Sequence, residues 1–181
     1  MIELKKADFA KEGKKIKALY IRAFPREERP PFFLIRKRAE QGRAECWSLY
    51  DGKAWAGFAY VLREGGLAYL FLLAIDEAKR GQGLGTQTIG ALLRQYDGCR
   101  FFLALEKMDP SSPNYEQRQK RHDFYIHCGL KDLPFHLKEA AVVYDAMGSG
   151  AQVLPEEYRR MMRAWLGWPF RRLIDVKMLK K

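Results

Sequence analysis

The chain has 181 residues, of which 48% are hydrophobic and 13% aromatic, and 33 basic against 22 acidic residues give it a net charge of +11. This composition indicates one globular domain with a substantial core and excludes a disordered chain. No apolar run is long enough to span a bilayer and the N-terminus has no signal-peptide core, so we expect a cytoplasmic protein. The basic residues are spread along the chain, which is more typical of a solvated surface than of a nucleic-acid groove.

The first half of the chain predicts two helices and an antiparallel meander of strands. The first helical pattern ends before Pro25, because proline disfavours helix in the residue that precedes it, and the second ends at Gly42. Asp51-Gly52 is a strong hairpin signal between two apolar runs. The predicted elements are a strand at 2–4, helices at 10–24 and 31–41, and strands at 44–50, 54–62 and 67–75.

The stretch from Leu67 to Tyr96 organises the rest of the chain. It begins with an unbroken apolar run that predicts a buried strand, and it ends with apolar residues at helical spacing. Between the two lie three glycines at alternate positions, Gly81, Gly83 and Gly85. A strand, a glycine-rich turn and a helix present backbone N–H groups and the positive end of the helix dipole to an anion, so this turn predicts a phosphate-binding site.

Two better-known phosphate motifs do not fit this turn. In a dinucleotide fingerprint the third glycine would fall on Thr86 or Thr88, and no Lys followed by Ser or Thr comes after the last glycine, as a nucleotide P-loop requires. The pattern that fits is Arg-x-x-Gly-x-Gly, made by Arg80, Gly83 and Gly85. The plain alternative is a tight turn between a strand and a helix.

The second half of the chain predicts one further strand–helix step and then two closing strands. Because a helix connects the strand at 100–106 to the strand before it, we expect this pair to be parallel with a right-handed crossover. Asn114 and Gln117 predict a side-chain cap for the next helix. The later elements are helices at 115–128 and 155–166, strands at 133–137 and 141–146, and a basic amphipathic tail over 169–181.

A second motif agrees with the turn. Phe124-Tyr125 followed by Gly129-Leu130 is similar to the Phe-Tyr-x-x-x-Gly-Phe stretch of the GNAT superfamily of N-acetyltransferases, with Leu in place of the commoner Phe. The turn from Arg80 to Gly85 looks like the acyl-CoA-binding signature of the same superfamily, and the order of the two motifs also agrees. The resemblance covers residues 2–147, and the segment 24–30 resembles a small, uncharacterised bacterial branch.

The resemblance implies a GNAT-like mixed α/β sheet whose fourth and fifth strands splay apart, with acetyl-CoA as co-substrate and no metal. The pantetheine arm would lie in that gap and bond backbone groups near Leu73, Ala74 and Ile75. The helix N-terminus beside the strand ends also favours an anion on physical grounds. The pyrophosphate would bind backbone amides of the turn formed by Arg80, Gly81, Gln82, Gly83, Leu84, Gly85 and Thr86.

Acetyl transfer to an amine needs a base that leaves the amine neutral and an acid that protonates the departing thiolate. By its match to the family motif, Tyr125 is implied to be the acid; the alternative is a half-buried tyrosine that packs on the sheet. Glu106 ends an otherwise apolar strand and is the candidate base; the alternatives are a surface or cap carboxylate and a route through water. For His122, one turn before Tyr125, a solvated helix histidine is the commoner role.

The segment between the first two helices is where GNAT proteins commonly build the acceptor pocket. Here Glu27 and Glu28 either hold a cationic amine or pair with Arg26 and Arg29. The basic side chains of the helix at 115–128 either face the CoA phosphates or form a solvated surface. These side chains are Arg118, Lys120 and Arg121.

We therefore predict an acetyl-CoA-dependent N-acetyltransferase in which an amine acceptor, such as a small molecule, attacks the thioester directly. Residues 1–147 would form the acetyltransferase domain. Residues 148–181 would form a C-terminal helix and basic tail that pack on the same domain or on the partner in a homodimer. Two other classes stay open: a sensor of the same fold that binds acyl-CoA without turnover, and a basic protein whose tail binds nucleic acid or a membrane surface.

Overall fold

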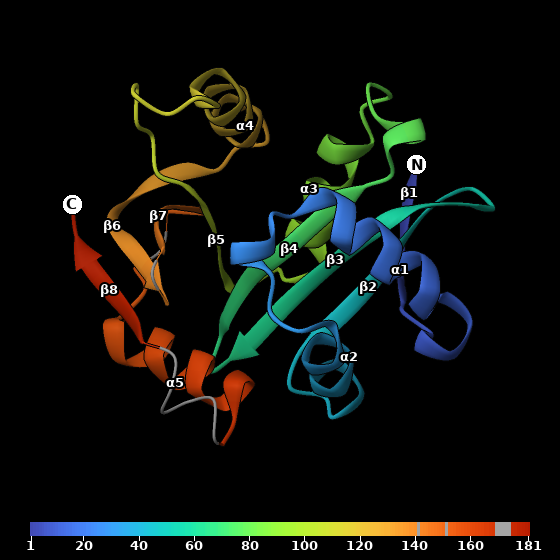
Figure 1. The fold of residues 1–181 in the computed structure, drawn as a ribbon, viewed down its shortest axis with the longest axis horizontal. Helices are drawn as coiled ribbons and strands as arrows, with labels where there is room; N and C mark the ends of the chain where they lie inside the picture. Colours follow the sequence, from blue (N-terminus) through green and yellow to red (C-terminus); the bar gives the residue numbers. More distant parts are fainter. Residues whose placement is uncertain (141, 151, 169–174) are drawn as a thin grey trace. The chain divides into compact units, whose positions relative to one another are not determined.

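The computed structural model describes residues 1–140, 142–150, 152–168 and 175–181, apart from the side chain of Glu27 (Figure 1). Its strands form an eight-stranded sheet in the order β1-β2-β3-β4-β5-β7-β6-β8. The strands are β1 Ile2–Lys6, β2 Glu45–Asp51, β3 Ala54–Glu64, β4 Leu67–Ile75, β5 Arg100–Glu106, β6 Lys131–Glu139, β7 Val142–Gly148 and β8 Val176–Lys180. The helices are α1 Phe9–Ala23, α2 Phe32–Glu40, α3 Leu84–Gln95, α4 Tyr115–His127 and α5 Pro155–Leu166, with short 3-10 helices η1 Arg26–Glu28 and η2 Glu77–Lys79.

The mixed α/β fold that the sequence predicts is confirmed. The hairpin strands β2 and β3 pair antiparallel, whereas β5 follows α3 and runs parallel to β4. A helical connection between neighbouring strands makes them parallel because it returns the chain to the same end of the sheet. The sheet is therefore mixed, with a crossover helix immediately after the glycine-rich turn.

The chain divides into two compact units. Unit 1 comprises residues 1–62 and 70–97, and unit 2 comprises residues 63–69 and 98–181. The glycine-rich turn and the two N-terminal helices belong to unit 1, whereas Glu106 and Tyr125 belong to unit 2. The domain boundary that the sequence analysis placed at residue 147 is of a different kind from the division into these two units, because it separates the part that resembles the family from a C-terminal addition. That boundary stays a prediction.

In unit 1, α1 and α2 lie in front of strands β2 and β3 (Figure 1). Ile16 and Leu19 on α1 are fully buried, as are Leu49 and Phe58 on the two strands. Burial of side chains of this size stabilises a fold by about 1.5–3 kcal/mol each. This packing fixes one side of α1 against the sheet and leaves its opposite side free to line a groove.

A buried carboxylate holds the start of α1 on β2. The side chain of Asp8 caps the helix, and Glu12 accepts the N–H of Asp8 in return. Glu12 also accepts hydrogen bonds from the hydroxyls of Ser48 and Tyr50 on β2. Burial favours a higher pKa for Glu12, but the hydrogen bonds from Tyr50 and Ser48 outweigh it and hold that pKa below its usual value. The rotation of α1 about its axis is thereby fixed.

In unit 2, α5 buries the apolar face that the sequence assigned to this domain or to a homodimer contact. The ring of Tyr158 lies 6.2 Å from that of Tyr69 and 6.5 Å from that of Phe102. Trp165 is also buried, with 1% of its surface exposed. Side chains of the same chain therefore cover the apolar face of α5. The homodimer stays a prediction, but the apolar face of α5 no longer supports it.

The basic tail expected over 169–181 is described only in part, because residues 169–174 lie outside the described residues. Residues Val176–Lys180 form β8, which pairs antiparallel with β6. The sequence analysis did not predict a strand for these residues. The five residues Val176–Lys180, with lysines at 177 and 180, are too short a period-2 pattern to predict a strand, and pairing with β6 decides their conformation.

Candidate functional site

The predicted phosphate-binding turn connects β4 to α3 in unit 1. After β4, Asp76 accepts the N–H of Ala78 and so caps η2. The chain then passes through Gly81 and Gly83, whose φ angles are 75° and 70°. Only glycine adopts this left-handed conformation without cost, and no atom lies within 4 Å of the position that a Cβ would take at either residue. The turn therefore needs glycine for its backbone and leaves open space beside it.

The N-terminus of α3 is available to an anion. Gly83 is the N-cap, and no side chain of the described residues caps the helix. The first backbone N–H groups of a helix have no partner within the helix, so those of Leu84, Gly85 and Thr86 can bind an anion. Arg80 is 56% exposed and its guanidinium lies 3.8 Å from the carboxylate of Glu77. Backbone donors, the helix dipole and an exposed cation thus meet at one turn.

The end of β4 is shaped by a glycine on the neighbouring strand. A Cβ on Gly57 would lie 2.1 Å from the carbonyl oxygen of Ala74, a distance that no side chain tolerates. The N–H of Asp76 donates to the carbonyl of Ala56 at 2.8 Å, so Asp76 and Ala74 face β3. Successive strand residues present their backbone groups to opposite edges. Of the three residues predicted to hold pantetheine, Leu73 and Ile75 therefore face away from β3, whereas Ala74 faces β3.

Tyr125, the predicted acid, is buried on α4 in unit 2, with 9% of its surface exposed. Burial raises the pKa of Tyr125 to about 12, although the positive charge of Arg121 acts in the opposite direction. Among the residues that the structure describes, no group forms a hydrogen bond with its hydroxyl. Tyr125 is therefore a protonated phenol whose O–H is available to a ligand atom.

Glu106, the predicted base, lies at the end of β5 with 16% of its side chain exposed. Its Oε1 accepts a hydrogen bond from Asn114 Nδ2 at 3.0 Å, and its Oε2 accepts one from Arg121 Nη1 at 2.6 Å. The guanidinium of Arg118 lies 3.6 Å from Oε1. Both carboxylate oxygens are thus engaged, and Glu106 connects the end of β5 to α4.

The predicted cap of α4 is wrong, because the side chain of Asn114 makes no capping hydrogen bond. It donates to Glu106 and accepts from Arg118 Nε at 2.8 Å instead. Arg118 also donates to the carbonyl of Lys107 at 2.6 Å. Asn114 and Arg118 therefore hold Glu106 in place. The guanidinium of Arg118 is already bonded within the chain, which does not favour the alternative in which it faces the CoA phosphates.

Arg121 connects the two predicted catalytic residues. It lies one turn before Tyr125 on α4, lowers the pKa of that phenol by its charge, and pairs with Glu106. Glu106 and Tyr125 therefore flank one guanidinium in unit 2. His122 is used elsewhere, since its Nε2 lies 3.0 Å from an oxygen of Asp132 on β6.

The described residues offer neither a metal site nor, at Cys46, an activated thiol. No cluster of three or more His, Cys, Asp or Glu side chains within the described ranges is placed to hold a metal ion. Burial raises the pKa of the Cys46 thiol to about 12, so this cysteine stays protonated and is a poor nucleophile. None of the described helices combines the length and the apolar composition that crossing a membrane requires.

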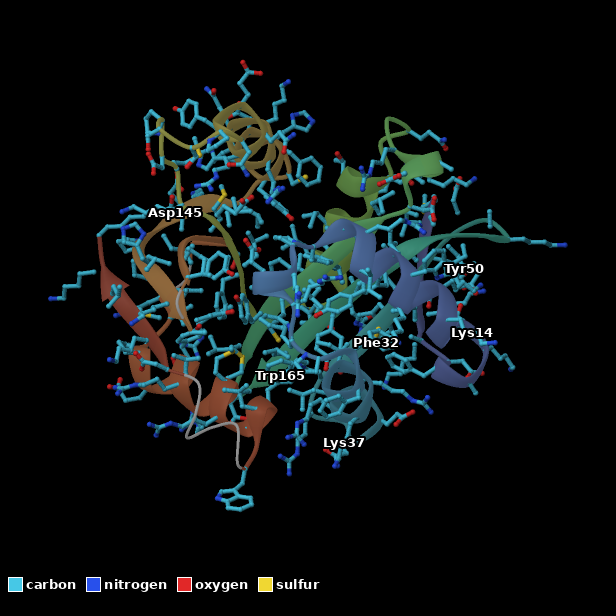
Figure 2. The ribbon with its side chains drawn as sticks, viewed as in Figure 1. Lys14, Phe32, Lys37, Tyr50, Asp145 and Trp165 are labelled. Atoms are coloured by element: carbon cyan, nitrogen blue, oxygen red, sulfur yellow. The ribbon has the colours of Figure 1, made fainter. Side chains whose placement is uncertain are left out.

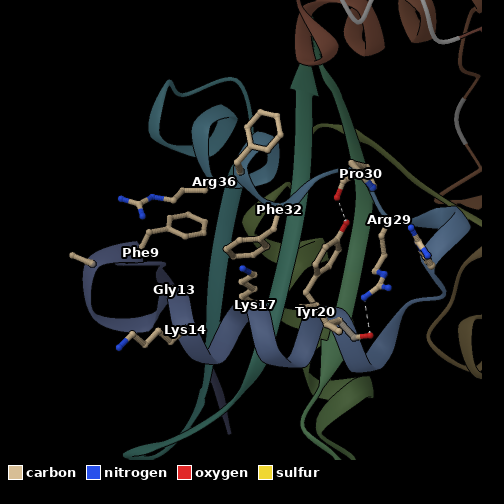
Figure 3. Close-up of a pocket in the computed structure, with 13 residues that line it drawn as sticks. Phe9, Gly13, Lys14, Lys17, Tyr20, Arg29, Pro30, Phe32 and Arg36 are labelled. Carbon is tan, nitrogen blue, oxygen red and sulfur yellow. Dashed lines mark hydrogen bonds between the residues drawn. The ribbon is translucent and has the colours of Figure 1, made fainter.

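A groove of about 770 Å³ lies between α1 and α2 in unit 1, at the segment that the sequence assigned to an acceptor pocket (Figure 3). Rings from Phe9, Tyr20 and Phe32 form much of its wall. Within the described side chains, no Asp or Glu lines it; Glu28 is not among the lining residues, and the side chain of Glu27 lies outside the described part. Five basic residues line the groove: Lys14, Lys17, Arg26, Arg29 and Arg36.

Comparison with known proteins shows the family. Residues 8–118 match the family model of the acetyltransferase (GNAT) domain. The chain therefore belongs to the GNAT family of acetyltransferases, whose general chemistry is acyl transfer from an acyl-CoA. No curated protein matches the chain.

Three solved structures illustrate the shared fold. A protein from Bacteroides thetaiotaomicron described as a GNAT-family acetyltransferase is 18% identical, with a TM-score of 0.69 over 94% of this chain and 98% of that one. A Bacillus subtilis acetyltransferase in complex with CoA is 14% identical, with a TM-score of 0.58 over 84% and 98%. An aminoglycoside 6′-N-acetyltransferase complexed with coenzyme A is 14% identical, with a TM-score of 0.63 over 84% and 99%. At these identities the likeness shows the fold.

Sequence reasoning missed two features of the site. Gly57 was passed over, although a glycine inside an apolar strand often marks a close approach of another backbone. Lys14 and Lys17 were also passed over, although their i, i+3 spacing places them on one face of α1. The groove lies at the segment where an acceptor pocket was expected. The basic side chains of α1 were not considered there, because the sequence analysis weighed only Glu27 and Glu28 as a site for an amine or as partners of Arg26 and Arg29.

Proposed function

We propose that the protein is an acetyl-CoA-dependent N-acetyltransferase that transfers the acetyl group directly to an amine. The observation that carries this proposal is the turn before α3 in a chain of the GNAT family. Gly81 and Gly83 hold left-handed conformations there, and no described side chain caps the helix. Such a turn favours a pyrophosphate, because it offers several N–H donors without a side chain in the way.

The proposed roles in binding follow from the backbone directions. The N–H groups from Gly81 to Thr86 bind the pyrophosphate, and exposed Arg80 adds a positive charge. Pantetheine carries two amides, which need backbone donors and acceptors along a strand. Leu73 and Ile75 are better placed to supply them than Ala74, because the Ala74 carbonyl faces Gly57 on β3.

In the proposed reaction, the nitrogen of a neutral amine attacks the carbonyl carbon of the thioester. The C–N bond forms, the C–S bond breaks, and the sulfur leaves as a thiolate. Tyr125 donates its proton to that thiolate, a role supported by a raised pKa and a hydroxyl without a described partner. The proton of the amine passes to Glu106 or, through water, to solvent.

A second candidate is a protein of the same fold that binds acyl-CoA without turnover. The observation that favours it is the engagement of both Glu106 oxygens by Asn114 and Arg121. A carboxylate held in this way serves as a structural link as readily as a base. No comparable observation favours binding of nucleic acid or a membrane through the tail, since Val176–Lys180 are paired with β6.

Thermal denaturation with CoA, together with an acetylation screen across classes of amine, tests the proposal. At a hundredfold excess over its dissociation constant, CoA should stabilise the protein by about 2.7 kcal/mol. An unchanged melting curve in millimolar CoA contradicts the proposed role of the turn. Stabilisation by CoA without acetylation of any amine supports the second candidate instead.

A further inference from the structure

We propose that the groove between α1 and α2 binds the acceptor, and that the acceptor is a small amine whose apolar or aromatic body carries an anionic group. This inference rests on the proposed function, since it names the substrate class for the same reaction. A volume of about 770 Å³ suits a small organic molecule. The charge of the groove, its aromatic walls and its connection to the end of β4 support this assignment.

The described charged side chains that line the groove are all basic. Lys14 and Lys17 are exposed on the outer face of α1 and make no ion pair or hydrogen bond within the described part of the chain. Arg29 donates to the carbonyl of Ile21 at 3.0 Å, which uses one of its N–H groups and keeps its charge. Arg36 is paired, because its Nε lies 2.7 Å from Glu40. The lysines therefore attract an anion and repel an amine that carries further positive charge.

The walls of the groove are aromatic and held in place. The ring of Phe32 lies 6.4 Å from that of Phe9 and 5.8 Å from that of Tyr20. The hydroxyl of Tyr20 donates to the carbonyl of Pro30 at 2.6 Å, so its polar end is bonded and its ring faces the groove (Figure 3). Fixed rings of this kind bind an apolar or aromatic body by stacking and burial.

One lining residue connects the groove to the strand that is proposed to hold pantetheine. Ile21 lines the groove, and the next residue, Arg22, lies 3.7 Å from the carboxylate of Asp76. Asp76 directly follows Ile75, the last residue of β4. An acceptor in the groove can therefore place its amine toward the end of β4 while its anionic group lies at Lys14 and Lys17.

Three amines that share one ring separate the possible charge preferences. These are 4-(aminomethyl)benzoate, benzylamine and 4-(aminomethyl)benzylamine, in which the group opposite the reacting amine is anionic, absent or cationic. With acetyl-CoA saturating, kcat/KM should be highest for the benzoate and lowest for the diamine, and the advantage of the benzoate should shrink at high salt. Equal values for all three, or a preference for the diamine, overturn the inference.

Charge reversal on α1 tests whether the groove is responsible. The double variant Lys14→Glu, Lys17→Glu should lower kcat/KM for the benzoate by about ten- to thirtyfold and leave benzylamine nearly unchanged. For the single variant Lys17→Glu, Lys37→Glu is the matched control, because Lys37 is exposed on α2, does not line the groove and undergoes the same change of charge (Figure 2). Equal losses in Lys37→Glu and Lys17→Glu would show a general charge effect and contradict the assignment to the groove.

Calorimetric titration of the protein with 4-(aminomethyl)benzoate in the presence of CoA gives a readout that does not need turnover. Binding that weakens in the double variant supports the inference even in a preparation without activity. If CoA stabilises the protein and benzylamine is acetylated, but the benzoate neither binds nor reacts, the inference is wrong while the proposed function stands. Absence of CoA binding contradicts the proposed function separately.

Discussion

The glycine-rich turn of unit 1 and the Glu106–Tyr125 cluster of unit 2 are two regions predicted to act in the same reaction, and they are built differently. The turn offers backbone N–H groups, and its shape depends on left-handed φ angles at Gly81 and Gly83. The cluster offers side chains, and its chemistry depends on the partners that each side chain finds. Glu106 has three such partners, whereas the hydroxyl of Tyr125 has none among the described residues.

This difference shows which functional assignments a pattern of residues can carry. A glycine in a turn restricts the backbone wherever it occurs, so the residue type already indicates the conformation. A carboxylate at the end of a strand acts as a base or as a structural link according to its neighbours. The following experiments test whether the backbone region is responsible for binding and the side-chain region for turnover.

The largest effect is expected for Tyr125→Phe, which removes the hydroxyl and keeps the ring. Turnover should fall by about 10² to 10⁴, the usual contribution of a positioned acid, while stabilisation by CoA stays the same. Tyr115→Phe on the same helix is the matched control and should keep its activity. If Tyr125→Phe turns over at the normal rate and chemistry is shown to limit that rate, Tyr125 is not the acid.

Gly83→Asp should abolish the stabilisation by CoA, a loss of about 2.7 kcal/mol at a hundredfold excess of ligand. The new side chain occupies the open space of the turn and places a carboxylate against the pyrophosphate. Gly42→Asp is the control, because Gly42 has a φ of 69° and the same open surroundings at the end of α2. Both variants strain the backbone alike, so a thermal shift with CoA that survives in both would contradict the role of the turn.

Glu106→Gln should lower the rate by about 10- to 10²-fold at low pH, where the acceptor amine is mostly protonated and needs a base. The loss should shrink as the pH approaches the pKa of the amine, because more amine then arrives neutral. The rate is compared with that of the unmodified protein from pH 6 to pH 9. A loss of stability with a pH-independent rate would instead identify Glu106 as the structural link between β5 and α4.

The smallest effect is expected from raising the pH to 10. Burial raises the pKa of Tyr125 to about 12, so its proton is held at pH 10 and lost only as the pH rises through about 12. A phenol with an ordinary pKa of about 10 would be half ionised at pH 10, with a twofold loss of acid. The ratio of the rates of the unmodified protein and Tyr125→Phe should therefore stay constant from pH 8 to pH 10. A halved ratio would show that burial does not protect the acid.

Much of this protein follows from its sequence, because the signals concerned are local. The apolar run of β4, the three glycines after it and the helical spacing that follows predict strand, turn and helix without knowledge of the rest of the chain. The Asp51-Gly52 hairpin was predicted for the same reason, and it is present between β2 and β3. Two motifs in the right order were enough to indicate the GNAT family, which the family model then showed.

The tertiary structure decided what depends on residues far apart in the chain. Asn114 was expected to cap α4 but bonds Glu106, because a neighbouring strand end supplied a carboxylate that local spacing does not reveal. Val176–Lys180 became a strand because β6 offered an unpaired edge. The groove between α1 and α2 has basic lining residues, because packing fixes the rotation of α1 and places Lys14 and Lys17 at the groove. Sequence determines local conformation through each residue's own sterics, whereas partners and charge patterns arise only when distant segments meet.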